Sequence, residues 1–175
     1  EYKSLLTSVT NKVNKSLDAA RSSEFRAGVI YDQDATREWP DEVTAVDAII
    51  TSPPFFDSTR FHMGNWMRLW FAGWEPEDFR SAPQQFVDER QKRSFDIYEP
   101  VFCQAVERLR PGGVFVLHLG RSKKCDMAEQ LAQVAGRYMT GADIYSESVE
   151  HCESHGIRDK GTVVDHQYMV LRNGD

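Results

Sequence analysis

The sequence predicts an α/β fold built on a sheet that is at least partly parallel. Two short apolar runs, residues 46–50 and 114–119, are bounded by turn-forming residues, which is the pattern of buried strands. Apolar residues at helical spacing occur before, between and after these two runs. Near-continuous apolar strands that alternate with amphipathic helices are typical of sheets covered on both faces. We therefore expect helices on both faces of the sheet.

The composition is that of an ordinary globular protein. The 175 residues, 41% hydrophobic and 27% charged, suit a single domain over residues 1–175 with a core of its own. The net charge of -6 does not favour a broadly basic surface, so nucleic-acid binding would need a local basic patch or a partner. Three cysteines without paired spacing favour a reducing compartment such as the cytoplasm. No apolar run approaches membrane-spanning length, so we expect neither a signal peptide nor a membrane anchor.

The first segment of the chain is amphipathic. It begins at Glu1 rather than at a methionine, as a piece of a longer protein would. Residues 2–21 carry leucine and valine at helical spacing and predict a helix that packs on a sheet. Residues 27–31 predict a short strand. Asp34 follows this strand, where it is either the cap of a short helix over residues 35–39 or a ligand contact.

The rest of the chain is organised around a proline corner, residues 51–55, which reads Thr-Ser-Pro-Pro-Phe. Pro53 and Pro54 have no backbone N–H and a fixed φ, so the strand over residues 46–50 must end there in a stiff turn. The carbonyls keep their acceptors while the local donors are removed, and aromatic side chains follow. Such a corner suits a flat ring that carries an amino group.

The proline corner resembles the (D/N/S)PP(Y/F/W) motif of amino-methyltransferases, in particular the TSPPY form of DNA N4-cytosine and some N6-adenine enzymes, as in restriction-modification systems. The resemblance implies that the Ser52 side chain and the Pro53 carbonyl accept the two hydrogens of the exocyclic amine, which orients its lone pair. It also implies that Pro54 belongs to the catalytic set and that Phe55 stacks on an extruded base. The family usually has Tyr here, and Phe lacks its hydroxyl, which leaves cytosine and adenine both open. The alternative is a corner that only ends a strand.

A second stretch carries the same resemblance. Residues 107–117 resemble the R-v-L-k-P-G-G step of class I methyltransferases, where a helix leads into the fifth strand. The resemblance covers residues 26–172 and implies part of a Rossmann-like class I methyltransferase sheet. It also implies that residues 142–150 and 162–171 pair antiparallel as a terminal hairpin at the edge of the sheet.

The cofactor implied by the resemblance is S-adenosylmethionine (AdoMet). Asp34 matches an acidic position that faces the adenine of AdoMet, and we expect Thr51 and Ser52 also to contact the cofactor. The glycine-rich AdoMet loop of the family is absent, since no G-x-G follows a strand. We therefore expect a catalytic, C-terminal half of a methyltransferase domain. Its cofactor site would be completed by upstream sequence, by a second chain, or not at all. The rival functions are an RNA or protein methyltransferase with the same corner and a non-catalytic binding module.

Candidate DNA contacts lie in the segment after the corner. Residues 61–74 hold three of the four tryptophans and predict a helix that ends near Gly73. We expect most of its aromatic side chains in the core. One or two of them near Arg60 and His62 are candidates to line a base pocket or to stack on a displaced strand.

Basic residues supply the other candidate DNA contacts. Residues 75–93 predict a polar insertion loop. Its cluster of Arg90, Lys92 and Arg93 is either a solvated face or a lip that contacts phosphates. Arg121 lies after the second strand, where α/β sheets place ligands.

The remaining segments predict packing elements. Residues 98–109 place apolar side chains on one helical face, and Asp126 is expected to cap a helix over residues 127–138. Residues 150–155 hold histidine, cysteine and glutamate but lack a second ligand pair at a known spacing, which favours a polar loop over a zinc site. We predict no metal site.

Overall fold

The computed structural model of the protein describes residues 4–20, 27–56, 60–149 and 163–174. The chain divides into two compact units, Glu1–Asp32 and Gln33–Asp175.

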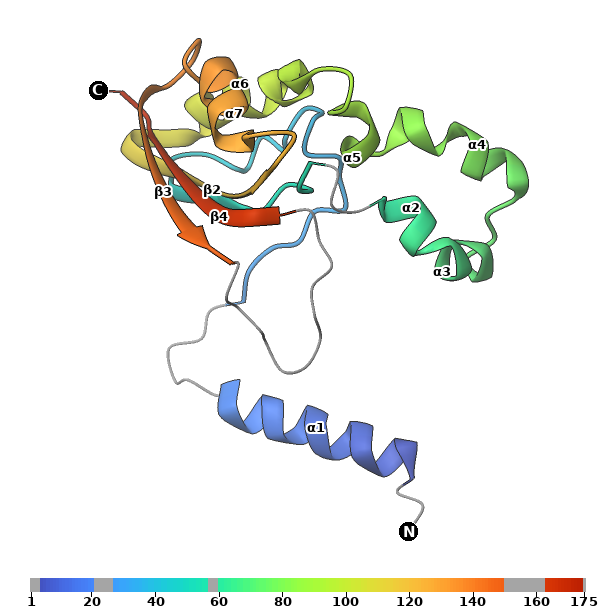
Figure 1. Cartoon of the computed structure of the whole chain (residues 1–175). Helices are drawn as coiled ribbons and strands as arrows, with labels where there is room; N and C mark the ends of the chain where they lie inside the picture. Colours follow the sequence, from blue (N-terminus) through green and yellow to red (C-terminus); the bar gives the residue numbers. More distant parts are fainter. Residues whose placement is uncertain (1–3, 21–26, 57–59, 150–162, 175) are drawn as a thin grey trace. The chain divides into compact units, whose positions relative to one another are not determined.

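The first unit contains one helix. Helix α1 (Leu5–Ala20) confirms the predicted helix (Figure 1). The strand predicted over residues 27–31 is wrong, because the described residues of this segment form neither a helix nor a strand. A short β-branched run becomes a strand only when a neighbouring strand completes its backbone hydrogen bonds, and none of the described strands pairs with this run.

The second unit is built on a four-stranded mixed sheet with the order β1-β2-β4-β3 (Figure 1). The strands are β1 (Val46–Thr51), β2 (Leu109–Ser122), β3 (Thr140–Ser148) and β4 (Val163–Arg172). Strands β1 and β2 run parallel, which confirms the predicted parallel pair. Strands β3 and β4 pair antiparallel, with β3 at the sheet edge, which confirms the predicted hairpin.

The helices of this unit fall between β1 and β3. They are α2 (Phe61–Gly64), α3 (Trp66–Phe71), α4 (Pro76–Gln85), α5 (Val87–Arg90), the 3-10 helix η1 (Phe95–Tyr98), α6 (Glu99–Arg108) and α7 (Met127–Ala135). Helices α6 and α7 are the ones that close the core. The side chain of Asp126 accepts a hydrogen bond from the backbone N–H of Glu129 at 3.1 Å, so the predicted cap of α7 is confirmed. The helix ends three residues earlier than predicted. None of the described helices is long and apolar enough to span a bilayer.

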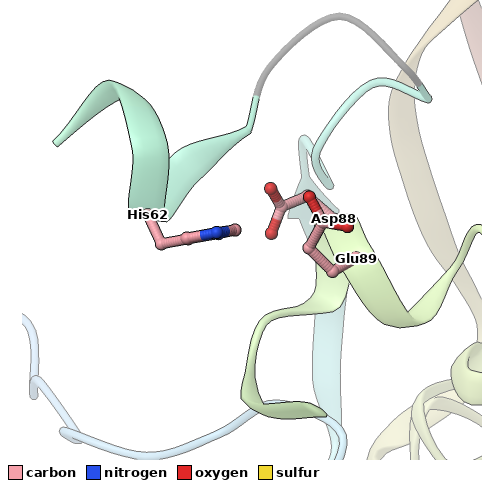
Figure 2. Close-up of side chains that lie close together, drawn as sticks. All are labelled: His62, Asp88 and Glu89. Carbon is pink, nitrogen blue, oxygen red and sulfur yellow. The ribbon is translucent and has the colours of Figure 1, made fainter. Parts of the chain in front are cut away.

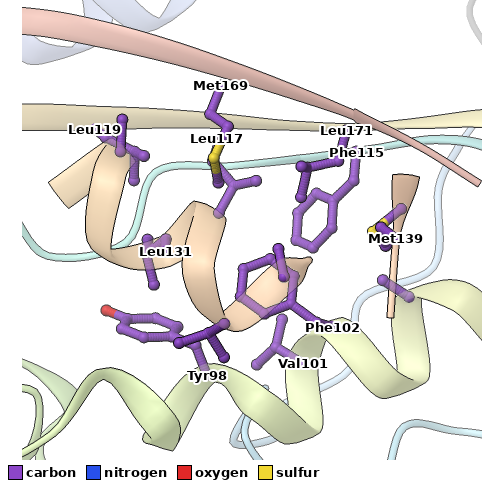
Figure 3. Close-up of a cluster of buried hydrophobic side chains, with 14 of the residues drawn as sticks. Tyr98, Val101, Phe102, Phe115, Leu117, Leu119, Leu131, Met139, Met169 and Leu171 are labelled. Carbon is purple, nitrogen blue, oxygen red and sulfur yellow. The ribbon is translucent and has the colours of Figure 1, made fainter. Parts of the chain in front are cut away.

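The core lies between one face of the sheet and the helices α6 and α7 (Figure 3). Alternate residues of β2 point into it, because side chains of a strand alternate between its two faces. Phe115, Leu117 and Leu119 are therefore buried, and they meet Phe102 of α6 and Leu131 of α7 in the buried cluster. This arrangement confirms that β2 is a buried strand.

The opposite face of the sheet is more open. Ile50 of β1, which lies in register with Val116, is 78% exposed, and Tyr168 of β4 is 37% exposed. Both α6 and α7 contribute to the core cluster on the other face. Helices on both faces are therefore not found among the described residues of this unit.

The segment between β1 and η1 differs most from the prediction. The expected polar loop over residues 75–93 is largely helical, because Glu75 and Asp78 form a capping box and Pro76 occupies the first turn of α4. The expected single helix over residues 61–74 is two short helices, and Gly73 (φ 93°) follows them.

Most aromatic side chains of α2 and α3 are exposed rather than in the core. Trp66 is 53% exposed, Trp70 58% and Phe71 77%. The helical spacing of 66 and 70 establishes that two side chains share a face, but not that another element covers this face. The prediction that these rings lie in the core was therefore wrong.

Candidate functional site

The proline corner lies at the carboxyl end of β1. Thr51 is the last residue of the strand and lies in parallel register with Leu117 of β2. The chain then leaves the sheet at Ser52, as the two prolines require. Pro53 is buried, whereas Ser52 is exposed. The hydroxyl of Ser52 is thus an accessible polar group of the corner.

A histidine of the neighbouring strand lies behind this hydroxyl. Ser52 Oγ is 3.4 Å from Nδ1 of His118. Burial of the imidazole, and secondly the charge of His166, lower the pKa of His118 below its ordinary value. With the ring proton on Nε2, the neutral imidazole accepts the hydroxyl proton of Ser52 at Nδ1. The lone pairs of Ser52 Oγ are then available as acceptors.

His118 belongs to an aromatic cluster. Its ring lies 4.9 Å from the ring of His166 and stacks on Tyr168 at 5.0 Å. Phe55 packs edge-on against His118, with ring centroids 5.2 Å apart. A Cβ atom added at Gly120 would lie 2.8 Å from Cγ of Phe55, so the ring occupies the space that a side chain at this position would need. Phe55 is therefore held against β2 by its neighbours.

A pocket of about 480 Å³ opens beside the corner. Its lining comprises Ser52, Pro54, Phe61, Phe86, Val87 and Asp88. The rings of Phe61 and Phe86 lie 5.3 Å apart and form an aromatic wall. This volume is within the range of small-molecule pockets, and mostly apolar walls with a few polar groups are usual for them. Phe55 is not part of the lining.

Two residues that the sequence does not single out hold the corner in place. Nε2 of Gln91 donates to the carbonyl oxygen of Pro54 at 3.0 Å, and the hydroxyl of Tyr98 donates to Oε1 of Gln91 at 2.8 Å. Gln91 is 1% exposed and Tyr98 is 5% exposed. Burial, and secondly the charge of Asp88, raise the pKa of Tyr98, which keeps this donor protonated. No sequence pattern connects these two residues to a corner far away along the chain.

Asp34 closes a turn. Its Oδ1 accepts hydrogen bonds from the backbone N–H of Thr36 at 2.9 Å and from the hydroxyl of Thr36 at 2.8 Å. Burial opposes ionisation, but these hydrogen bonds, Arg90 and Arg37 together lower the pKa of Asp34. Residues 35–36 form a turn, and residues 35–39 do not form the short helix that was one of the two expectations.

The basic side chains that were predicted to contact DNA differ in whether they form ion pairs or hydrogen bonds within the protein. The guanidinium of Arg121 forms an ion pair with Asp165, and the ammonium of Lys92 lies 2.9 Å from Glu89. Arg90 donates to the hydroxyl of Thr36 at 3.4 Å.

Of the other residues predicted to contact DNA, Arg60 and Arg93 are exposed and His62 is buried. Arg60 and Arg93 are exposed and form no ion pair with another described residue. His62 is only 6% exposed, so a contact between this side chain and a DNA strand is not supported. The polar segment 150–155 lies outside the described residues.

Comparisons with known proteins identify no family. No family model and no curated protein matches the chain. Among solved structures, it is similar to two crystal structures of TTHA0409 from Thermus thermophilus, which is provisionally described as a DNA modification methylase. For the selenomethionine derivative the TM-score is 0.42 at 13% identity, over 81% of this chain and 51% of that chain. For the other crystal structure the TM-score is 0.39 at 14% identity, over 75% of this chain and 48% of that chain. The chain thus spans about half the length of these structures.

Proposed function

We propose that the proline corner is the acceptor site of an AdoMet-dependent DNA amino-methyltransferase. The reaction is transfer of a methyl group to the exocyclic amine of cytosine or adenine. The observation that carries this proposal is the exposed hydroxyl of Ser52, which lines an aromatic pocket and lies 3.4 Å from Nδ1 of His118.

The roles of Ser52 and His118 follow from hydrogen-bond chemistry. An exocyclic amine is a weak nucleophile with two N–H donors, so it needs acceptors that fix its orientation. Ser52 Oγ serves as one acceptor when its own proton is directed to Nδ1 of His118. The carbonyl of Pro53 is the second acceptor. Both acceptors also stabilise the positive charge that develops on the nitrogen during methyl transfer.

The aromatic wall supplies a binding surface for the base. We assign stacking to Phe61 and Phe86, because their rings line the pocket. Phe55 packs against His118 instead and positions this imidazole. An extruded base that stacks on aromatic rings gains about 1–3 kcal/mol per base.

The nucleic-acid surface is proposed to include the exposed side chains of α2 and α3. Trp66 and Trp70 offer accessible rings, which bind unpaired bases regardless of sequence. Arg60 and Arg93 are exposed cations that could contact phosphates. A local surface of this kind is what an acidic chain needs in order to bind DNA.

The described residues provide only part of a cofactor site. Asp34 and Thr51 offer acceptors for AdoMet, but no glycine-rich loop with its backbone donors follows a described strand. AdoMet, when bound, supplies the methyl group. We propose that another segment or a second chain completes its site, so the 175 residues alone should bind AdoMet weakly.

Methyl transfer to duplex DNA tests the proposal. Products are separated into N4-methylcytosine and N6-methyladenine, first for the full chain and then for the full chain with the partner that completes the cofactor site. Ser52→Ala should lower kcat more than it lowers DNA affinity, because the acceptor is needed mainly when charge develops on the amine. Thermal melting of each variant serves as the folding control. If a well-folded Ser52→Ala, Phe61→Ala double variant methylated DNA at the full rate, the acceptor site would lie elsewhere.

A further inference from the structure

Three side chains that the proposed function does not use converge beside the pocket. His62 comes from α2, whereas Asp88 and Glu89 come from α5. One possible ligand atom from each of them lies within 4.8 Å of the others. Figure 2 shows the imidazole of His62 directed across the gap between the helices toward the two acidic residues.

His62 is the residue that points to a ligand. Its side chain is 6% exposed, and its Nδ1 is buried without a hydrogen-bond partner. Burial of a polar nitrogen without a partner is unfavourable, so native proteins rarely leave one in this state. The ring lies 6.0 Å from the ring of Phe86 with an interplanar angle of 20°, and this stacking fixes its orientation. A cation bound to the imidazole nitrogen would give it a partner and so remove the free-energy cost of its burial.

The carboxylates supply the matching negative charge. Asp88 is 2% exposed, and its Oδ2 accepts a hydrogen bond from the backbone N–H of Phe61 at 2.7 Å. This bond involves one oxygen of the carboxylate, and no described residue forms a hydrogen bond with the other. Glu89 is 15% exposed and pairs with the ammonium of Lys92 at 2.9 Å. Among the described residues, the ammonium of Lys92 is the one cation that forms an ion pair with these two adjacent carboxylates.

We propose that His62, Asp88 and Glu89 bind a divalent transition-metal ion, Zn²⁺ or Mn²⁺. Imidazole nitrogen suits zinc and carboxylate oxygen suits manganese, so a mixed set of one nitrogen and two oxygens selects this class over Ca²⁺ or Mg²⁺. The hydrogen bond from Phe61 to Asp88 acts as the outer contact that orients a ligand. The role of the ion is structural, because it ties α2 to α5, and Asp88 of α5 also lines the pocket next to the proline corner.

Calorimetric titration of the metal-free full chain with ZnCl₂ and with MnCl₂ tests this site. The unmodified chain should bind one ion that depends on His62. His62→Ala should weaken binding by more than about 100-fold, which is the upper end of the loss caused by removing only an outer-shell contact. Lys92→Met should strengthen binding by a few-fold, because it removes the cation that competes for Glu89.

Matched variants separate loss of a ligand from loss of structure. Glu89→Gln and Glu77→Gln each remove the acid of an i,i+3 ion pair, with Lys92 and Arg80 respectively, but only the first removes a proposed ligand. We expect weakened metal binding in Glu89→Gln and unchanged binding in Glu77→Gln, with both variants folded by thermal melting. The double variant His151→Ala, His155→Ala tests the other group of possible ligands and should retain the ion.

The outcomes that would overturn the site are equally definite. The proposal fails if neither ion binds the unmodified chain. It also fails if binding survives in Glu89→Gln and His62→Ala, or if it is lost in the His151→Ala, His155→Ala variant instead. Absorption of bound Co²⁺ provides an independent readout, since its spectrum should change when the histidine nitrogen is removed. None of these measurements depends on methyl transfer, so the metal site and the proposed function can fail separately.

Discussion

The hydrogen-bond relay from Tyr98 through Gln91 to Pro54 predicts that Tyr98→Phe changes the free energy of unfolding in opposite directions with and without Gln91. Tyr98 donates to Gln91, and Gln91 donates to the carbonyl of Pro54, with Gln91 and Tyr98 both buried. Tyr98→Phe removes the hydroxyl and leaves Oε1 of Gln91 without its donor. An unsatisfied buried polar group costs about 1–3 kcal/mol, so the free energy of unfolding should fall by about that amount.

Gln91→Leu should be more destabilising than Tyr98→Phe. It leaves the buried hydroxyl of Tyr98 and the part-buried carbonyl of Pro54 without partners, for a loss of up to about 6 kcal/mol. In this background the hydroxyl of Tyr98 has already lost its acceptor. Adding Tyr98→Phe should therefore increase stability, although the same change decreases stability in the unmodified chain.

Urea denaturation of the four proteins in this double-mutant cycle measures the effect. The slope of unfolding free energy against urea concentration should stay the same, so that shifts of the midpoint report stability. Additive free energies would refute the relay, because they would mean that the two side chains do not depend on each other. A stabilising Tyr98→Phe in the unmodified chain would show that its hydroxyl is not satisfied by Gln91.

Three further expectations follow from the site. The pKa of His118 is lowered from 6.5 in the folded protein, so the unfolded chain takes up its proton first as the pH falls. The free energy of unfolding should therefore decrease from about pH 6.5 downward until the folded pKa is passed. His118→Gln should flatten this part of a titration of stability against pH. Gly120→Ala should cost about 1–3 kcal/mol in chemical denaturation, because its Cβ would lie 2.8 Å from the ring of Phe55; equal stability would show that the ring moves freely. Replacing Arg60 and Arg93 together by glutamine should weaken DNA binding evenly across sequences and reduce the dependence of log K on log salt by about 2. An unchanged slope in a filter-binding titration would remove both residues from the proposed DNA surface.

The sequence predicts the elements that depend on local pattern. The apolar runs of β1 and β2 and the cap at Asp126 are confirmed, because periodicity and capping are short-range properties. The terminal hairpin, which the family resemblance implied, is also confirmed. The capping box of Glu75 and Asp78 was also visible in the sequence, but the charge of the segment was interpreted as a loop. The segment is helical because the box and Pro76 satisfy the first turn in spite of its polarity.

Local patterns do not predict whether another element covers a helix face, or which residues far apart in the chain come into contact. Trp66 and Trp70 share a helical face, but only the tertiary structure reveals that this face is exposed. Gln91 lies far from the corner along the chain, yet it bonds to Pro54. His62 and Asp88 approach each other only because two short helices meet. Such contacts arise from chain topology and leave no local signature.

The chemistry of the proline corner depends on strand register as much as on its own residues. In the parallel ladder Thr51 lies opposite Leu117, so the next residue of β1's chain, Ser52, lies beside His118. In the antiparallel ladder His118 lies opposite Tyr168, on which its ring stacks. A shift of β1 by one residue would place a leucine beside the hydroxyl of Ser52, since residues on either side of His118 are leucines that point into the core. Ser52 would then have no acceptor for its proton, and its oxygen would be less available to an amine. A sequence motif for this corner therefore specifies the proposed acceptor, whereas the register between β1 and β2 specifies its hydrogen-bonding state.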